Sequence, residues 1–268
     1  MSWSENGRRD GRARWCEVAD GVLARRYAEL DLTTGLVLGT ERALVIDTRG
    51  DERQGAELAA AVRAVTRLPI VVAITHAHFD HCFGTAAFLP CPVHAHPGCA
   101  AALRVTADTQ RAEWVAHYRR RAPETAEALA ATVPVEPDGT VDPVALVDLG
   151  GRTVQLRHLG RGHTDHDVVA HVPDQGVVFA GDLVEQGAPP DFGDAFPQDW
   201  PATVAALLAL GPGVVVPGHG EPMTPSEVAD QRDALERVAA LHAAVATGAL
   251  DAAEAQRRSP FPGVRWPR

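Results

Sequence analysis

Residues 75–84 read THAHFDHCFG and follow directly on the apolar segment IVVAI at residues 70–74. The stretch contains four residues of types that bind metal ions, namely His76, His78, Asp80 and His81. Imidazole and carboxylate groups suit zinc, iron or manganese, and one turn at the end of a strand can aim several lone pairs at a common point. A packed core has no use for this spacing. The stretch therefore predicts a metal site at the end of a buried strand.

Three further candidate ligands each follow an apolar, β-like segment and stand directly after a glycine. They are His163 in GRGHTDHD, Asp182 in VVFAGDL and His219 in VVVPGHG. Glycine lacks side-chain bulk and permits tight turns, so the repeated pattern suggests separate loops that converge at one edge of a sheet. With the first cluster these residues make seven potential ligands, enough for two metal ions.

The segments around these motifs alternate between strand and helix patterns. Strands are predicted at 36–38, 43–46, 70–74, 154–159, 168–172, 177–180 and 214–216, and helices at 52–67, 97–131, 202–210 and 226–255. The Pro/Gly-rich passage 133–143 and the C-terminal tail are predicted to be irregular. We interpret residues 1–268 as a single domain with a helical insertion at about 97–141 and a C-terminal helical extension at about 226–255.

Composition and charge limit the partners of the chain. The 268 residues include 46% hydrophobic residues, but no apolar run approaches the ~20 residues of a membrane span. With 35 acidic against 25 basic residues the formal net charge is -10, which opposes binding to DNA or RNA. The Arg119–Arg121 triplet is interpreted as a solvated helix face. We expect a small-molecule substrate, no nucleic acid and no membrane, and the sequence indicates no oligomeric state.

The N-terminus and the cysteines indicate a cytoplasmic protein. Residues 1–15 are polar and show no apolar stretch after their arginines, so neither a secretory nor a twin-arginine signal is predicted. Cys16, Cys82, Cys91 and Cys99 show no paired spacing, which predicts free, reduced thiols.

From about residue 35 to 220 the chain resembles the metallo-β-lactamase superfamily, with the motifs in that family's order. The resemblance implies an α/β fold, a four-layer αβ/βα sandwich of two mixed β-sheets with the metals at one edge. It assigns the first metal to His76, His78 and His163, the second to Asp80, His81 and His219, and the bridge between them to Asp182. The implied cofactors are two Zn²⁺ ions, with iron or manganese as alternatives.

The chemistry of such a site explains these residue types. Two metal ions ~3.5 to 4 Å apart lower the pKa of a shared water and polarise the oxygen at the scissile bond, so no side-chain nucleophile is needed. Asp182 and Asp80 are the predicted catalytic carboxylates: Asp182 sets the metal separation, and Asp80 orients the nucleophile or takes up a proton. Asp47, at the end of a strand, either holds a ligand histidine, as the resemblance suggests, or caps a turn.

Three functions stay open at this point. The leading hypothesis is a dinuclear zinc hydrolase of a small ester, thioester, lactone or amide, since GRGHTDHD and PGHG look most like the glyoxalase-II-like branch. The presence of His81 and of Asp182 as the bridge argues against a dedicated β-lactamase. One alternative is an iron-dependent dioxygenase of the persulfide type, with a mononuclear site drawn from His76, His78, His163 or Asp182. The other is a non-catalytic metal or redox-relay protein.

Two segments are candidates for the substrate pocket. The insertion contains Trp114 among alanines and is interpreted either as a specificity lid or as a plain packing helix. The loop at 186–200, QGAPPDFGDAFPQDW, follows Asp182 and predicts an apolar pocket wall. That wall would consist of Phe192, Phe196 and Trp200. His166 and Asp167 are expected to line the pocket, and His117, His158, His171 and His242 to be structural.

Overall fold

The first of two β-sheets spans the N-terminal half of the chain in a computed structural model that describes residues 13–267. Within that range the sheet has seven strands in sequence order. They are β1 (Trp15–Ala19), β2 (Val22–Arg26), β3 (Thr33–Leu38), β4 (Ala43–Ile46), β5 (Ile70–Ala73), β6 (Val93–Ala95) and β7 (Gly139–Thr140). Neighbours are antiparallel from β1 to β4 and parallel from β4 to β7, so this sheet is mixed.

The second sheet is formed by the C-terminal half and is also mixed. Among the described residues its five strands stand in the order β12-β11-β10-β9-β8. They are β8 (Val144–Asp148), β9 (Thr153–Arg157), β10 (Val169–Val172), β11 (Val177–Glu185) and β12 (Val214–His219). Only the pair β11 and β12 is parallel.

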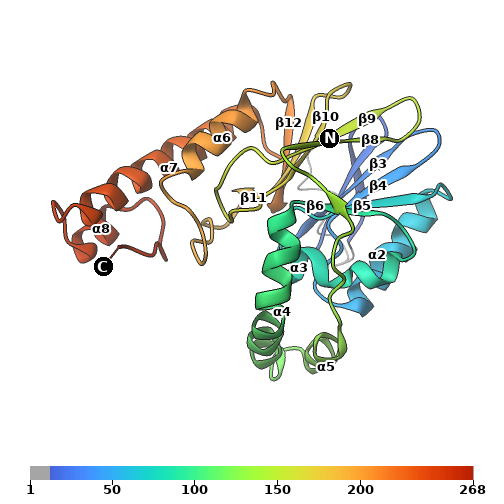
Figure 1. The fold of residues 1–268 in the computed structure, drawn as a ribbon, viewed down its shortest axis with the longest axis horizontal. Helices are drawn as coiled ribbons and strands as arrows, with labels where there is room; N and C mark the ends of the chain where they lie inside the picture. The colour runs from blue at the N-terminus through green and yellow to red at the C-terminus, as the bar shows by residue number, and fades with distance from the viewer. Residues whose placement is uncertain (1–12, 268) are drawn as a thin grey trace.

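Helices cover the outer face of each sheet (Figure 1). On the first sheet lie α2 (Glu52–Val65), α3 (Phe79–Cys82), the 3₁₀ helix η1 (Phe83–Phe88), α4 (Pro97–Tyr118) and α5 (Pro123–Ala131). On the second lie α6 (Trp200–Leu208) and α7 (Pro225–Ala246), with α8 (Ala252–Arg258) packed on α7. The predicted four-layer αβ/βα sandwich of two mixed sheets is therefore confirmed.

Strand alternation divides the buried side chains among the three interfaces of this sandwich. In β4, Ala43 and Val45 face the helices while Leu44 and Ile46 face the other sheet. In β11, Val177 and Phe179 pack between the sheets, and Val178 and Ala180 pack on α6 and α7. Because every strand of this kind is apolar on both faces, it reads in sequence as a continuous hydrophobic run.

Some element predictions were incomplete. The predicted helix at 97–131 is interrupted at residues 119–122, before Pro123, because proline cannot continue the preceding helix. The passage 133–143 is not wholly irregular, since it contains β7, which pairs with β6. The C-terminal helix is likewise two helices, α7 and α8. The strands β1, β2, β6 and β8 were not predicted.

Other sequence predictions concern the cysteines and the membrane. All four cysteines are free, as predicted. Between residues 13 and 267, no helix combines the length and hydropathy needed to cross a membrane. The prediction about a signal sequence falls on residues 1–15, most of which lie outside the described part of the chain, and the single-domain interpretation stays a prediction.

Candidate metal centre

The seven predicted ligands, which come from five places in the sequence, meet at one edge of the two sheets. His76 and His78 lie in the turn between β5 and α3, and Asp80 and His81 lie in α3. His163 follows β9, Asp182 lies within β11, and His219 ends β12. The side chains form two groups, His76, His78, His163 and Asp182 in one and Asp80, His81 and His219 in the other. Within each group the candidate ligand atoms lie within 4.8 Å of one another.

Two glycines give Asp182 its place between these groups. Gly181 adopts a φ of 54°, in the left-handed region, where the register between β11 and β12 shifts. A β-carbon on Gly218 of β12 would collide with the Asp182 carboxylate. The glycines that precede the ligands therefore serve the positioning of a carboxylate across a strand pair.

Each of the five imidazoles has one ring nitrogen directed at an oxygen away from the centre. His81 Nδ1 lies 2.7 Å from Asp47 Oδ2, His78 Nε2 3.2 Å from Asp194 Oδ1, and His219 Nδ1 2.7 Å from the Leu30 carbonyl. Carboxylates and carbonyls accept hydrogen bonds, so these nitrogens carry the ring proton. The network therefore assigns the lone pair of each ring to the other, inward nitrogen.

The remaining two rings follow the same rule. His163 Nδ1 lies 3.3 Å from the carbonyl of Asp191. His76 Nδ1 lies 3.0 Å from Thr75 Oγ1, whose own proton is directed at Asp47 Oδ2 at 2.8 Å. The hydroxyl therefore accepts from His76. All five rings are held in the tautomer that points a lone pair into the centre.

The inward atoms face one another without the partners that buried polar atoms require. His163 Nε2 lies 2.9 Å from His78 Nδ1, and His81 Nε2 lies 3.3 Å from His219 Nε2. His76 Nε2 and Asp182 Oδ1 are buried and make no hydrogen bond. Facing lone pairs repel, and buried polar atoms are normally satisfied, so the arrangement calls for cations at these points. The donor set of imidazoles and carboxylates fits zinc or a similar transition metal.

The electrostatics of the site favour positive charge at the same points, and on His81 and His219 this charge is a second ring proton that a metal ion would replace. Burial alone would lower the pKa of His219, but Asp182 and Asp80 raise it to about 10. Burial also opposes the charged form of His81, yet the carboxylates of Asp182, Asp80 and Asp47 raise its pKa well above the usual range. By contrast, burial and the neighbouring His78 lower the pKa of His163 to about 4.

Asp47 makes the contact that the family resemblance suggested. Its Oδ2 accepts from His81, and its Oδ1 accepts from the Thr75 backbone N–H at 2.8 Å. The residue has a φ of 62°, a conformation that aspartate and asparagine tolerate better than other residues with a β-carbon. A strained strand end thus places one carboxylate beneath the first ligand turn.

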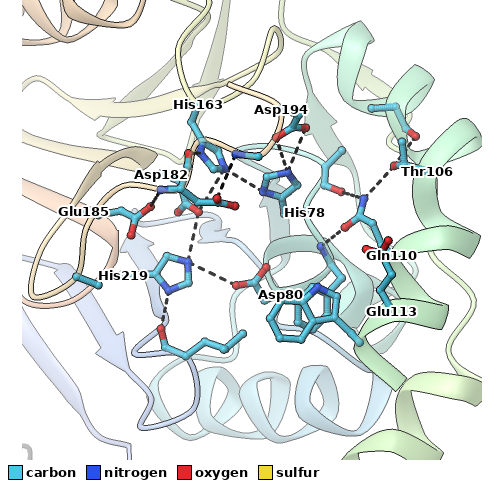
Figure 2. Close-up of a pocket in the computed structure, with 18 of the residues that line it drawn as sticks. His78, Asp80, Thr106, Gln110, Glu113, His163, Asp182, Glu185, Asp194 and His219 are labelled. Carbon is cyan, nitrogen blue, oxygen red and sulfur yellow. Dashed lines mark hydrogen bonds and ion pairs between the residues drawn. The ribbon is translucent and has the colours of Figure 1, made fainter. Parts of the chain in front are cut away.

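A pocket of about 680 Å³ opens above the candidate ligands (Figure 2). One side is a single face of α4, with Thr106, Gln110, Glu113 and Trp114 among its lining residues. This supports the interpretation of the insertion as part of the pocket rather than as a plain packing helix. His117, which was predicted to be structural, also lines the pocket.

The loop 186–199 forms the opposite side, but the expected apolar wall was wrong. Phe192 and Trp200 are only 2% and 0% exposed, and neither they nor Phe196 lines the pocket. The Trp200 indole N–H donates to the Leu183 carbonyl at 3.0 Å, and its ring lies against His163. Because α6 begins at Trp200, its side chain belongs to the core between helix and sheet. The loop presents Ala188, Asp191, Gly193 and Asp194 to the pocket instead.

The GHTDHD segment contains two more residues that were predicted to line the pocket, and both are buried. His166 lines the pocket as expected, and its Nε2 accepts a hydrogen bond from the Ala77 backbone N–H at 3.2 Å. Asp167 does not line it, because both carboxylate oxygens accept from Thr164. Burial raises the pKa of Asp167 to about 7.

Gln110, Glu185 and Asp194 are among the polar residues of the site that the sequence reasoning did not identify. Gln110 lies four residues from both Thr106 and Trp114, so the helical period could have indicated a shared face. Asp194 and Glu185 carry no such signal. Glu185 lines the pocket beside Asp182, and burial, together with the Asp182 charge, raises its pKa to about 8.

Comparisons with known proteins agree with this geometry. The family model described as Metallo-beta-lactamase superfamily matches residues 31–219. A metallo-beta-lactamase type 2 of Bacillus cereus is 28% identical over 196 residues, 70% of this chain and 67% of that protein. The acyl-coenzyme A thioesterase MBLAC2 of Gallus gallus is 28% identical over 57% of each chain. A solved metallo-beta-lactamase from Pontibacter korlensis superposes with a TM-score of 0.67 at 21% identity, covering 84% of this chain and 99% of that one.

Proposed function

The chain belongs to the metallo-beta-lactamase superfamily, and we propose that it is a dinuclear zinc-dependent hydrolase of a small ester, thioester, lactone or amide. The observation that carries the proposal is the set of five imidazoles that each direct one ring nitrogen inward, with Asp182 between their two groups. A structural role for this edge of the sheets would not require five lone pairs aimed at two points beneath an open pocket.

We assign the proposed metal ligands as two sets that share one carboxylate. The first set is His76, His78 and His163, the second is Asp80, His81 and His219, and Asp182 would contact both ions. Two bound zinc ions would polarise a substrate carbonyl and lower the pKa of a water molecule. We assign Asp80 the role of orienting that water or receiving its proton, and its carboxylate, 3.5 Å from His219 Nε2 in the lining of the pocket, supports this role.

The proposed substrate class is supported by what the named relatives have in common. A β-lactamase opens an amide and an acyl-coenzyme A thioesterase cleaves a thioester, so both names describe attack by water at an acyl carbon. In this chain the pocket is bounded by the apolar Trp114 and Ala102 on one side and by acidic residues on the other. A small acyl compound fits these features, and the narrower glyoxalase-II-like subgroup stays a prediction.

The alternative of an iron-dependent dioxygenase has one observation in its favour. His76, His78, His163 and Asp182 alone form a group that could hold a single iron ion. The second group, Asp80, His81 and His219, favours two metals, because without a second ion its inward-facing polar atoms would have no binding partner. Metal analysis separates the hypotheses, since one iron per chain favours oxygenation and about two zinc ions favour hydrolysis.

The proposed function is tested with matched small substrates that differ in the bond cleaved. Purified, zinc-loaded protein is assayed with a chromogenic ester, a thioester, a lactone, a β-lactam and a phosphodiester, before and after chelation and after zinc is restored. We expect metal-dependent turnover of at least one acyl compound. Metal-loaded protein that hydrolyses none of them would favour the non-catalytic metal or redox-relay alternative. A cytoplasmic location stays a prediction.

A further inference from the structure

We propose that Gln110 of α4 is a positioning residue for the first metal site, so that this helix of the insertion holds a metal-ligand turn in place. The inference rests on the proposed two-metal function. Gln110 points toward the ligand turn that carries His78 (Figure 2) and contacts the residues on both sides of it. Its Nε2 donates to the Ala77 carbonyl at 3.0 Å, and its Oε1 accepts from the Phe79 backbone N–H at 2.9 Å. The residue thereby fixes the two peptide groups that flank one metal ligand.

The Gln110 amide has only one orientation in which these bonds form. A carbonyl can only accept and a backbone N–H can only donate, so Nε2 must face Ala77 and Oε1 must face Phe79. The second N–H of the amide donates to Thr106 Oγ1 at 2.9 Å, and that hydroxyl donates to the Ala102 carbonyl. Both amide hydrogens and the amide oxygen are therefore used, and the side chain is anchored along its own helix.

The ligand turn needs this external support. His78 is the N-cap of the four-residue helix α3, and its side chain makes no capping hydrogen bond, because its imidazole points to the metal site. The first N–H groups of a helix have no partner within the helix. Gln110 supplies the missing acceptor to Phe79 from another helix. On the other side of the turn, His166 accepts from the Ala77 N–H, so residues 77–79 are held from two directions.

The same face of α4 also forms the pocket. Trp114, one turn after Gln110, stacks on Phe79 with ring centroids 4.4 Å apart and lines the cavity. A shift of α4 would therefore move both the wall of the pocket and the peptide groups around His78. Occupancy of the first metal site and order in α4 should depend on each other, since coupling between two sites is reciprocal.

The test measures zinc binding and leaves turnover aside. Gln110→Met keeps the length of the side chain and removes its donor and acceptor, whereas Gln110→Glu keeps the acceptor for Phe79 and removes the donors. Thr109→Ala, an exposed neighbour on α4, is the control for a change in the helix itself. Each protein is titrated with zinc against a competing chelator, and its secondary structure is checked by circular dichroism.

We expect one of the two zinc affinities to fall by ~10- to 100-fold in Gln110→Met, the usual effect of removing a group that orients a metal ligand. The second zinc affinity and both affinities of Thr109→Ala should match the wild type. Hydrogen exchange in α4 should slow when zinc binds to the wild type, and less so in the variant. Wild-type zinc affinities in Gln110→Met would overturn the inference. If Gln110→Met does not fold, the zinc affinities of Gln110→Glu are measured instead: a fall in one of them supports the inference, and wild-type values overturn it.

Failure of the proposed function would look different in this experiment. A wild-type protein that binds no zinc, or only one ion, refutes the metal centre on which the inference rests. A wild type that binds about two zinc ions, beside a Gln110→Met variant that binds them equally well, leaves the metal centre intact and refutes only the role of Gln110.

Discussion

Replacing Asp47 by asparagine tests whether hydrogen bonds to residues that are not metal ligands fix the tautomers of the ligand histidines. The substitution keeps the volume of the side chain and its tolerance of a φ of 62°. In the native protein the two carboxylate oxygens accept from the Thr75 N–H, the Thr75 hydroxyl and His81 Nδ1. Asparagine has one oxygen and one NH₂ group, so it cannot accept from both sides of this arrangement.

Both orientations of the new amide have a cost. If its oxygen keeps the Thr75 N–H, the NH₂ group faces His81 Nδ1, and the ring proton must move to Nε2, where the metal lone pair was. Zinc affinity at the second site should then fall ~10- to 100-fold, or about 1.4 to 2.8 kcal/mol. If the amide turns round, the buried Thr75 N–H is left without an acceptor, which lowers the free energy of unfolding by about 1 to 3 kcal/mol.

The assay combines zinc titration against a chelator with urea unfolding of the metal-free protein. Asp51→Asn is the matched control, because Asp51 is also buried, lies four residues away and caps α2 through the Gln54 N–H at 2.7 Å. Asparagine serves as an N-cap equally well, so this variant should match the wild type in both measurements. An Asp47→Asn protein with native zinc affinities and native unfolding free energy would refute the account of how the rings are oriented.

Two further predictions concern residues that the sequence placed wrongly. Trp200→Ala should lower the free energy of unfolding by ~3 to 5 kcal/mol, because the ring is fully buried. A loss below ~1 kcal/mol in urea unfolding would contradict the assignment of this ring to the core. Asp167 has its pKa raised by burial from 3.8 to about 7, so its contribution to stability is fully present below pH 3.8 and lost as the pH rises through about 7. In metal-free protein the advantage of Asp167→Asn over the wild type should therefore grow between pH 4 and pH 8, on the order of 4 kcal/mol, and an advantage independent of pH would contradict the buried, protonated state.

The sequence indicated which candidate ligands lie together because metal-binding motifs have short spacings. His76, His78, Asp80 and His81 lie within six residues after β5, while His163 follows β9, Asp182 lies within β11 and His219 ends β12 at the same edge. Residue type and spacing alone therefore indicated the centre. The resemblance to a family then ordered the seven residues into two sets, and the structure brings together the same two groups.

The surroundings of the centre were less predictable because they depend on distant parts of the chain. Trp200 follows a loop next to a ligand, yet its ring enters the core because a helix begins at that residue and packs on β11. Gln110 lies 32 positions after His78 and has no distinctive residue type. Its role emerges only when α4 is packed against the ligand turn, where two peptide groups happen to need a donor and an acceptor.

The paired substitution of Asp182 and His219 separates a bridge from an ordinary ligand. Asp182 belongs to the first group but lies 3.2 Å from His81 Nε2 and 3.3 Å from His219 Nε2 in the second. Removing it withdraws a negative charge from both proposed ions, whereas removing His219 withdraws one neutral ligand from the second ion only.

The central claim is tested most directly by the zinc content per chain of the wild type, Asp182→Ala and His219→Ala, measured by atomic spectroscopy after unbound metal is removed. We predict about two zinc ions in the wild type, about one in His219→Ala, and a loss from both sites in Asp182→Ala. The two-metal centre would be contradicted by a His219→Ala protein that retains both ions while Asp182→Ala loses only one.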